Sequence, residues 1–83
     1  MSYVLYGTEA CHLCELAQQV IVEVASQQPI DVYLEDIAES EALVERYGTR
    51  IPVLKNELNG RELDWPFSAA ELSHWLHQAQ FTS

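Results

Sequence analysis

Apolar residues recur at helical spacing in three stretches of the chain. In the first stretch, apolar side chains fall three or four positions apart, and glutamates and glutamines fill the opposite face. We expect this helix to end near residues 26–28, before Pro29. Its predicted apolar face consists of Leu13, Leu16, Ala17, Val20, Ile21 and Val24.

Two shorter helices are predicted further along the chain. Asp36 and Ser40 are both candidate amino-terminal caps for a helix through residues 42–47, which Gly48 is expected to end in the left-handed conformation. Ser68 is expected to cap the last helix. The apolar face predicted for that helix is Leu72, Trp75, Leu76 and Ala79.

Short runs of β-branched, aromatic and aliphatic residues predict strands between the helices. The predicted strands are residues 3–6, 30–34, 51–55 and 61–63. Asn59-Gly60 lies between the last two and predicts a two-residue hairpin turn. The two strands joined by that turn are therefore expected to pair antiparallel.

The order of these elements predicts the architecture, which is β-α-β-α-β-β-α. A β-α-β unit makes the first two strands parallel, so the simplest closure is one mixed four-stranded sheet covered by three helices. This α/β arrangement is the thioredoxin-like architecture. The sequence contains no internal repeat, low-complexity tract or linker, and we expect residues 1–83 to form a single domain.

Composition and charge limit the functions that this domain can perform. With 48% hydrophobic residues the chain can build a core, and disorder is not expected. Its formal charge of −9 argues against binding to nucleic acid or to an anionic membrane surface. The sequence has neither a signal-peptide pattern nor an apolar run approaching ~18 residues. We therefore expect a monomer in the cytoplasm.

Both cysteines of the chain lie in one motif, Cys11-His12-Leu13-Cys14, where the first strand gives way to the first helix. Two thiols at this spacing at the amino end of a helix are typical of thiol–disulfide exchange. Free backbone N–H groups and the helix dipole favour negative charge there, so the pKa of Cys11 is expected below the free-thiol value of ~8.5. His12 is either a solvent-exposed residue or a cation that stabilises the thiolate.

The residues around this motif resemble the glutaredoxin-like family of the thioredoxin superfamily, in particular its small bacterial members. The resemblance rests on Leu5 to Cys14, on Tyr47-Gly48-Thr49-Arg50-Ile51-Pro52-Val53-Leu54 and on Glu62-Leu63-Asp64-Trp65-Pro66-Phe67. It implies that Cys11 is the nucleophile, that Cys14 resolves the mixed disulfide, and that Pro52 follows a cis peptide bond. It also implies a substrate groove near Thr8, His12, Arg50, Ile51 and Pro52, where the backbone of Ile51 pairs with an extended substrate.

The chain departs from typical glutaredoxins at positions that hold glutathione. Those proteins carry Pro-Tyr between the cysteines, and a lysine stands where this chain has Thr8. Their Gly-Gly and aspartate segment before the last helix is also absent, which leaves Arg50 as the obvious cation near the expected groove. The expected partner is a disulfide-containing protein or glutathione. No cofactor is expected, with glutathione as a candidate co-substrate.

Two other functions are open for the same motif. Cys11 and Cys14 could bind zinc or an iron–sulfur cluster, and His74 and His77 lie near one face of the last helix. The interval from Cys14 to His74 is, however, far longer than in zinc fingers. The domain could alternatively be a non-catalytic binding module that holds a partner along Ile51 and Pro52.

Overall fold

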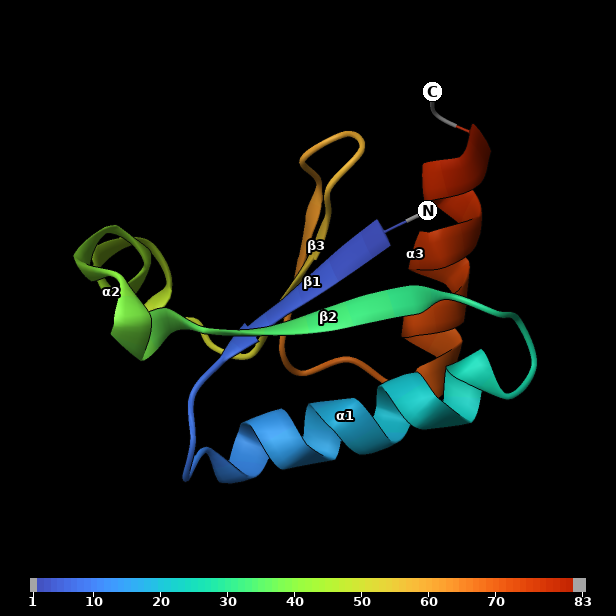
Figure 1. The fold of residues 1–83 in the computed structure, drawn as a ribbon. Helices are drawn as coiled ribbons and strands as arrows, with labels where there is room; N and C mark the ends of the chain where they lie inside the picture. The colour runs from blue at the N-terminus through green and yellow to red at the C-terminus, as the bar shows by residue number, and fades with distance from the viewer. Residues whose placement is uncertain (1, 82–83) are drawn as a thin grey trace.

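A computed structural model describes residues 2–81 of the chain, with side chains described as far as His77. It confirms the predicted β-α-β-α-β-β-α order and adds one short 3₁₀ helix, η1 (Figure 1). The elements are β1 (Ser2–Gly7), α1 (His12–Ala25), β2 (Asp31–Asp36), η1 (Ile37–Glu39), α2 (Glu41–Tyr47), β3 (Val53–Asn56), β4 (Glu62–Asp64) and α3 (Ala69–Phe81).

The strands form one mixed sheet in the order β2-β1-β3-β4. β1 runs parallel to β2, with Gly7 opposite Asp36. β1 and β3 are antiparallel, with Tyr6 opposite Val53, and β4 continues the antiparallel half. The end of β1, the end of β2 and the start of β3 therefore meet at one edge of the sheet, next to the start of α1 (Figure 1).

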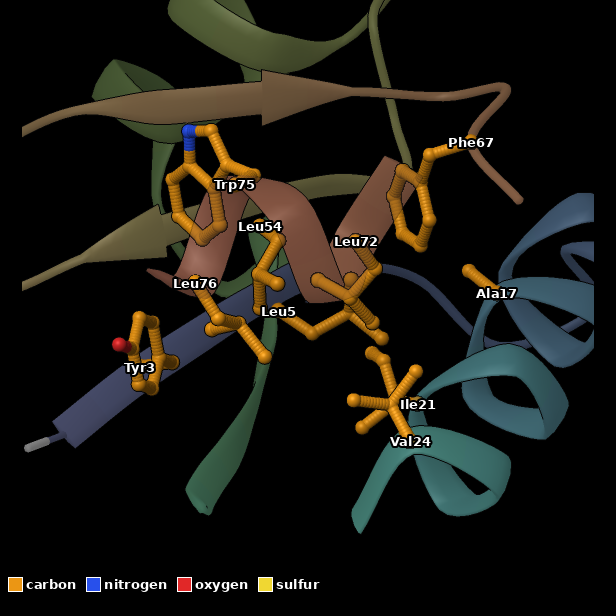
Figure 2. Packing of buried hydrophobic residues seen from close by; sticks show 10 residues of the cluster. All are labelled: Tyr3, Leu5, Ala17, Ile21, Val24, Leu54, Phe67, Leu72, Trp75 and Leu76. Atoms are coloured by element: carbon orange, nitrogen blue, oxygen red, sulfur yellow. The ribbon is translucent and has the colours of Figure 1, made fainter. Parts of the chain in front are cut away.

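The main core lies between one face of the sheet and the two long helices (Figure 2). Side chains alternate between the two faces of a strand, so Tyr3 and Leu5 of β1 reach this core, whereas Tyr6 packs on the opposite face with Tyr47 and Val53. The buried residues of the main core are Tyr3, Leu5, Ala17, Ile21, Val24, Leu54, Phe67, Leu72, Trp75 and Leu76.

The predicted helical faces are largely the buried ones. In α1, Ala17, Ile21 and Val24 are buried as expected, but Leu13 is 46% exposed, because Cys14 is the residue of the first turn that is buried. In α3, Leu72, Trp75 and Leu76 are buried, and the side chain of Ala79 lies outside the described residues. Ser68 caps α3 as predicted, since its Oγ accepts the Glu71 N–H at 3.0 Å.

The two candidate caps before α2 belong to two different helices. Asp36 Oδ1 accepts the Ala38 N–H at 2.9 Å and caps η1, whereas Ser40 Oγ accepts the Leu43 N–H at 3.4 Å and caps α2. The predicted left-handed conformation of Gly48 is wrong, because its φ is −52°. A Cβ at Gly48 would lie 2.5 Å from the Val44 carbonyl oxygen, so the close approach of the backbone explains the glycine.

The predicted two-residue hairpin is also wrong, because β3 ends at Asn56 and β4 begins at Glu62. Gly60 does have a positive φ of 75°, and its N–H donates to the Asn56 carbonyl at 2.8 Å. Two side-chain amides fold the longer loop, since Asn56 Oδ1 accepts the Leu58 N–H and Asn59 Oδ1 accepts the Arg61 N–H. These local bonds stabilise the wider turn.

Candidate functional site

The two cysteines lie at the junction between β1 and α1. Cys11 is the N-cap of α1, and Cys14 lies in its first turn. The structure holds them as a disulfide, with Cα atoms 5.2 Å apart. Cys14 is 4% exposed, whereas Cys11 is partly exposed. An incoming group therefore reaches the Cys11 sulfur more easily than the Cys14 sulfur.

Backbone groups of α1 are directed at the Cys11 residue. The Cys14 N–H donates to Cys11 Sγ at 3.1 Å, so the sulfur occupies the position of a capping oxygen. The Glu15 N–H donates to the Cys11 carbonyl at 3.2 Å and begins the helical bonding. A donor and the positive end of a helix dipole both stabilise negative charge on this sulfur.

Gly7 is a site residue that sequence reasoning missed. It is the last residue of β1 and is buried beneath the disulfide. A Cβ at this position would lie 2.8 Å from Cys14 Sγ and 3.3 Å from Cys14 Cβ. The missing side chain therefore allows the first turn of α1 to pack directly on the end of β1. The available signal was a glycine at the end of a strand just before the cysteine motif.

The loop that joins β1 to α1 contains a residue with unusual backbone geometry. Ala10, directly before Cys11, has a φ of +62°, in the left-handed region that L residues rarely adopt. Such conformations cost on the order of 1 kcal/mol and require support from the surrounding structure. Here the left-handed conformation of Ala10 turns the chain so that Cys11 lies at the amino end of α1.

Ile51 and Pro52 lie at the same edge of the sheet as the disulfide. The peptide bond between them is cis. The Trp65–Pro66 bond is also cis, and this second cis bond was not predicted from the sequence. Tyr6 pairs with Val53, so Gly7 and Pro52 follow one position further toward that edge. The Ile51 N–H already donates to the Tyr47 carbonyl at 3.0 Å. A substrate that used this N–H would have to break that bond.

Arg50 is bound to carboxylates of β4. Its Nη2 lies 2.8 Å from both Glu62 Oε1 and Asp64 Oδ1, and its Nε donates to Asp64 Oδ2 at 3.2 Å. The Tyr47 hydroxyl donates to Glu62 Oε2 at 2.6 Å. These bonds join the residue before Ile51 to the neighbouring strand, so two anions already surround the guanidinium expected to face the groove.

This network changes the acidity of its members. The hydrogen bond from Tyr47 and the charge of Arg50 hold the pKa of Glu62 below its usual value. Burial, followed by the bond to Glu62, raises the pKa of Tyr47 to about 12. The Tyr47 ring also stacks on Tyr6 with centroids 4.3 Å apart, so the network is continuous with the smaller core.

A cavity of about 400 Å³ adjoins the disulfide on the side of β2. Its lining includes Leu5, Gly7 and Leu34, together with Thr8 and both cysteines. Five of its lining residues are acidic, namely Glu9, Glu15, Glu35, Asp36 and Glu39. The structure therefore brings Thr8 together with the cysteines, whereas Arg50 is not among the described residues that line this space.

The histidines lie outside this constellation. The His12 side chain is 79% exposed, and its Nδ1 lies 3.7 Å from Glu15 Oε2. His74 and His77 are exposed on α3. Within the part of the chain that the structure describes, no group of three or more His, Cys, Asp or Glu side chains is arranged to hold a metal ion. In the same part, no helix is both long and apolar enough to cross a membrane.

A cysteine pair at the start of α1, beside a proline at the edge of a mixed four-stranded sheet, defines a protein of the thioredoxin superfamily. The model of the glutaredoxin-like domain family (DUF836) matches residues 3–77. The chain belongs to this family, as its sequence motifs indicated. No curated protein matches it.

Solved structures agree with this assignment. An X-ray structure of a structural genomics target protein from X. campestris is 37% identical, with a TM-score of 0.82 over 92% of this chain and 96% of that one. A protein from Nitrosomonas europaea is 25% identical, with a TM-score of 0.77 over 89% and 88% of the two chains. Thioredoxin 2 from Pseudomonas aeruginosa, 22% identical with a TM-score of 0.74 over 99% and 81%, shares the fold.

Proposed function

We propose that this protein is a thiol–disulfide oxidoreductase that cycles between a Cys11/Cys14 dithiol and the disulfide seen in the structure. The observation that carries the proposal is the disulfide itself, formed between a partly exposed N-cap sulfur and a buried sulfur one turn further on. Family membership and the thioredoxin-like fold support a redox role for this pair.

The proposed reaction begins with the reduced protein. The Cys11 thiolate attacks one sulfur of a substrate disulfide, forms a mixed disulfide with it and releases the other half as a thiolate. Cys14 then loses its proton and attacks Cys11 Sγ, which releases the second half and closes the Cys11–Cys14 bond. The substrate gains two electrons and two protons, and the cysteines lose them. An external thiol must return the electrons by the reverse exchange.

The different environments of the two sulfurs support these roles. Cys11 is partly exposed and accepts the Cys14 N–H, so it suits the attacking thiolate. Cys14 is buried against Gly7 and lies within bonding reach of Cys11 Sγ, so it suits the thiol that attacks Cys11 Sγ in the mixed disulfide. The electron pair is held by the two sulfurs, so the exchange needs no resident cofactor. We propose a monomer that acts on a disulfide-containing protein or on glutathione disulfides. We propose the cytoplasm as its compartment, because disulfides in a reducing compartment are usually transient and catalytic.

Trapping the mixed disulfide tests this function. In a Cys14→Ser variant the second step is blocked, so substrates should remain attached at Cys11 and be identified by mass spectrometry. The matched control is Cys11→Ser, which retains the buried Cys14 thiol and should trap no adduct under the same conditions. Equal trapping by both variants, or none by Cys14→Ser, would overturn the proposed roles. Stoichiometric zinc or iron in the anaerobically purified protein would favour metal binding instead.

A further inference from the structure

The cavity beside the disulfide combines a partly apolar lining with carboxylates from separate segments. Leu34 of β2 is 61% exposed and contributes apolar surface, whereas Leu5 and Gly7 of β1 also line the cavity but are buried. Glu9 comes from the loop before Cys11, and Glu15 from the first turn of α1. The remaining three acidic residues follow Leu34 at the end of β2 and on η1. They are Glu35, Asp36 and Glu39.

Positive charge does not balance these carboxylates. Among the described residues that line the cavity, none is lysine, arginine or histidine. Two of the chain's four cations, Arg46 and Arg50, lie near Glu62 and Asp64 of β4 instead. His12 is near Glu15 but is directed into solvent, with 79% of its side chain exposed. A molecule that enters the cavity therefore meets the field of charged side chains of one sign.

The reactive sulfurs lie inside this field. Cys11 and Cys14 line the same cavity as the five acidic residues, so a substrate disulfide that reaches Cys11 through this cavity comes close to the carboxylates. Two unit charges 4 Å apart interact by about 1 kcal/mol in water, and several carboxylates act on one approaching group. A cavity lined by one sign of charge raises the encounter rate of an oppositely charged substrate by about 10–10³-fold.

We propose that this cavity selects cationic substrates, namely a disulfide-bonded cysteine flanked by lysine or arginine in a partner protein. The inference rests on the proposed disulfide exchange and names its substrate class. The lysine or arginine side chains lie along the carboxylates, and their methylene stems pack against the exposed Leu34. Anionic disulfides, including glutathione disulfide, are disfavoured by the same field. The covalent steps are unchanged, and only the binding of the attacked disulfide is affected.

The test uses three disulfide-linked dimers of one pentapeptide with a central cysteine flanked by lysine, glutamine or glutamate. The rate at which each dimer oxidises the reduced protein is divided by its rate with dithiothreitol, which removes differences in intrinsic reactivity. We expect the lysine dimer to react at least about tenfold faster than the glutamate dimer at low salt. The ratio should fall toward one near 1 M salt, where the Debye length is about 3 Å.

Matched variants locate the effect in the cavity. Glu15→Gln, Glu35→Gln and Glu39→Gln together remove three cavity charges. Glu23→Gln, Glu45→Gln and Glu57→Gln remove three exposed charges that do not line it. We expect the first triple variant to lose most of the lysine-over-glutamate ratio and the second to keep it. Any change in the reactivity of Cys11 affects all three dimers equally and cancels in the ratio.

The possible results separate this inference from the proposed function. Equal corrected rates for the three dimers, or an equal loss of the ratio in both triple variants, would overturn the cationic preference and leave disulfide exchange standing. Failure of the reduced protein to form the Cys11–Cys14 disulfide with any dimer would instead overturn the proposed function itself.

Discussion

Gly7 and Cys14 are packed so closely that a single methyl group does not fit between them. A Cβ on Gly7 would lie 2.8 Å from Cys14 Sγ, well inside van der Waals contact. The contact joins the end of β1 to the first turn of α1, the two elements whose junction holds both cysteines. The spacing between strand and helix is therefore set by the absence of a side chain at this position.

Gly7→Ala should destabilise the oxidised protein by about 1–3 kcal/mol, since overpacking forces the strand and helix apart. Urea unfolding of the wild type and the variant measures the cost. In a Cys14→Ala background the Sγ is gone, and the same substitution should cost clearly less. An identical cost in both backgrounds would show that the effect of the methyl group arises elsewhere.

Protonation of Glu62 should lower the free energy of unfolding in acid. Its pKa is lowered in the folded protein by Tyr47 and Arg50. A lowered folded-state pKa gives stability that is fully present above the unfolded value of ~4.3 and is lost as the pH falls through the folded one. Glu62→Gln should therefore reduce the loss of stability below about pH 4.3, measured by urea unfolding from pH 7 to pH 3. Glu57→Gln, at an exposed position, should leave the acid dependence intact.

At alkaline pH the expected effect comes from Tyr47. Its pKa is raised to about 12, so the neutral phenol stabilises the fold below pH ~10. This stability is lost as the pH rises from about 10 to about 12. Tyr47→Phe should flatten the loss in that interval, measured by unfolding at a series of pH values. Tyr33→Phe, on exposed β2, is the control and should behave as the wild type.

Arg50→Gln should lower stability without slowing the reaction with glutathione disulfide. Its guanidinium is already bound to Glu62 and Asp64, so the substitution removes these bonds from Asp64 and leaves Glu62 with the Tyr47 hydroxyl and Arg46. Urea unfolding and the rate at which glutathione disulfide oxidises the reduced protein measure the two effects. A slower reaction with unchanged stability would instead place Arg50 in the binding of glutathione.

The Cys11 thiol should react with iodoacetamide faster than a model thiol at neutral pH. The Cys14 N–H and the amino end of α1 favour its thiolate. The pH dependence of alkylation in a Cys14→Ser variant measures this, because that variant retains the backbone N–H. His12→Ala should change the rate little, since the imidazole is largely in solvent. A rate no higher than that of the model thiol would contradict the role of the helix terminus.

Local patterns were sufficient to predict most of the fold. The apolar spacing of α1, the capping serine before α3 and the order of elements each depend on residues close together in sequence, and the structure confirms them. The errors at Gly48 and at Asn59-Gly60 have the same origin. Glycine indicates an unusual backbone position but does not distinguish a positive φ from a close approach, nor a short turn from a longer one.

The environment of the site was harder to predict, because it depends on contacts between distant residues. The sequence shows the Cys11/Cys14 pair directly, since both sulfurs belong to one helical turn. Arg50 was expected to face the substrate groove, but its guanidinium is bound to Glu62 and Asp64 of β4. These partners are 12 and 14 residues away in sequence, so no local pattern indicates them. The acidic cavity depends on three segments that meet only after β1 and β2 pair in parallel.

The disulfide spans no more than the start of α1, where the two Cα atoms are 5.2 Å apart, as they are for neighbours on successive turns of any helix. Opening the bond therefore requires no strand or helix to change its place. We therefore expect a partner that distinguishes the oxidised from the reduced protein to contact this turn of α1 directly.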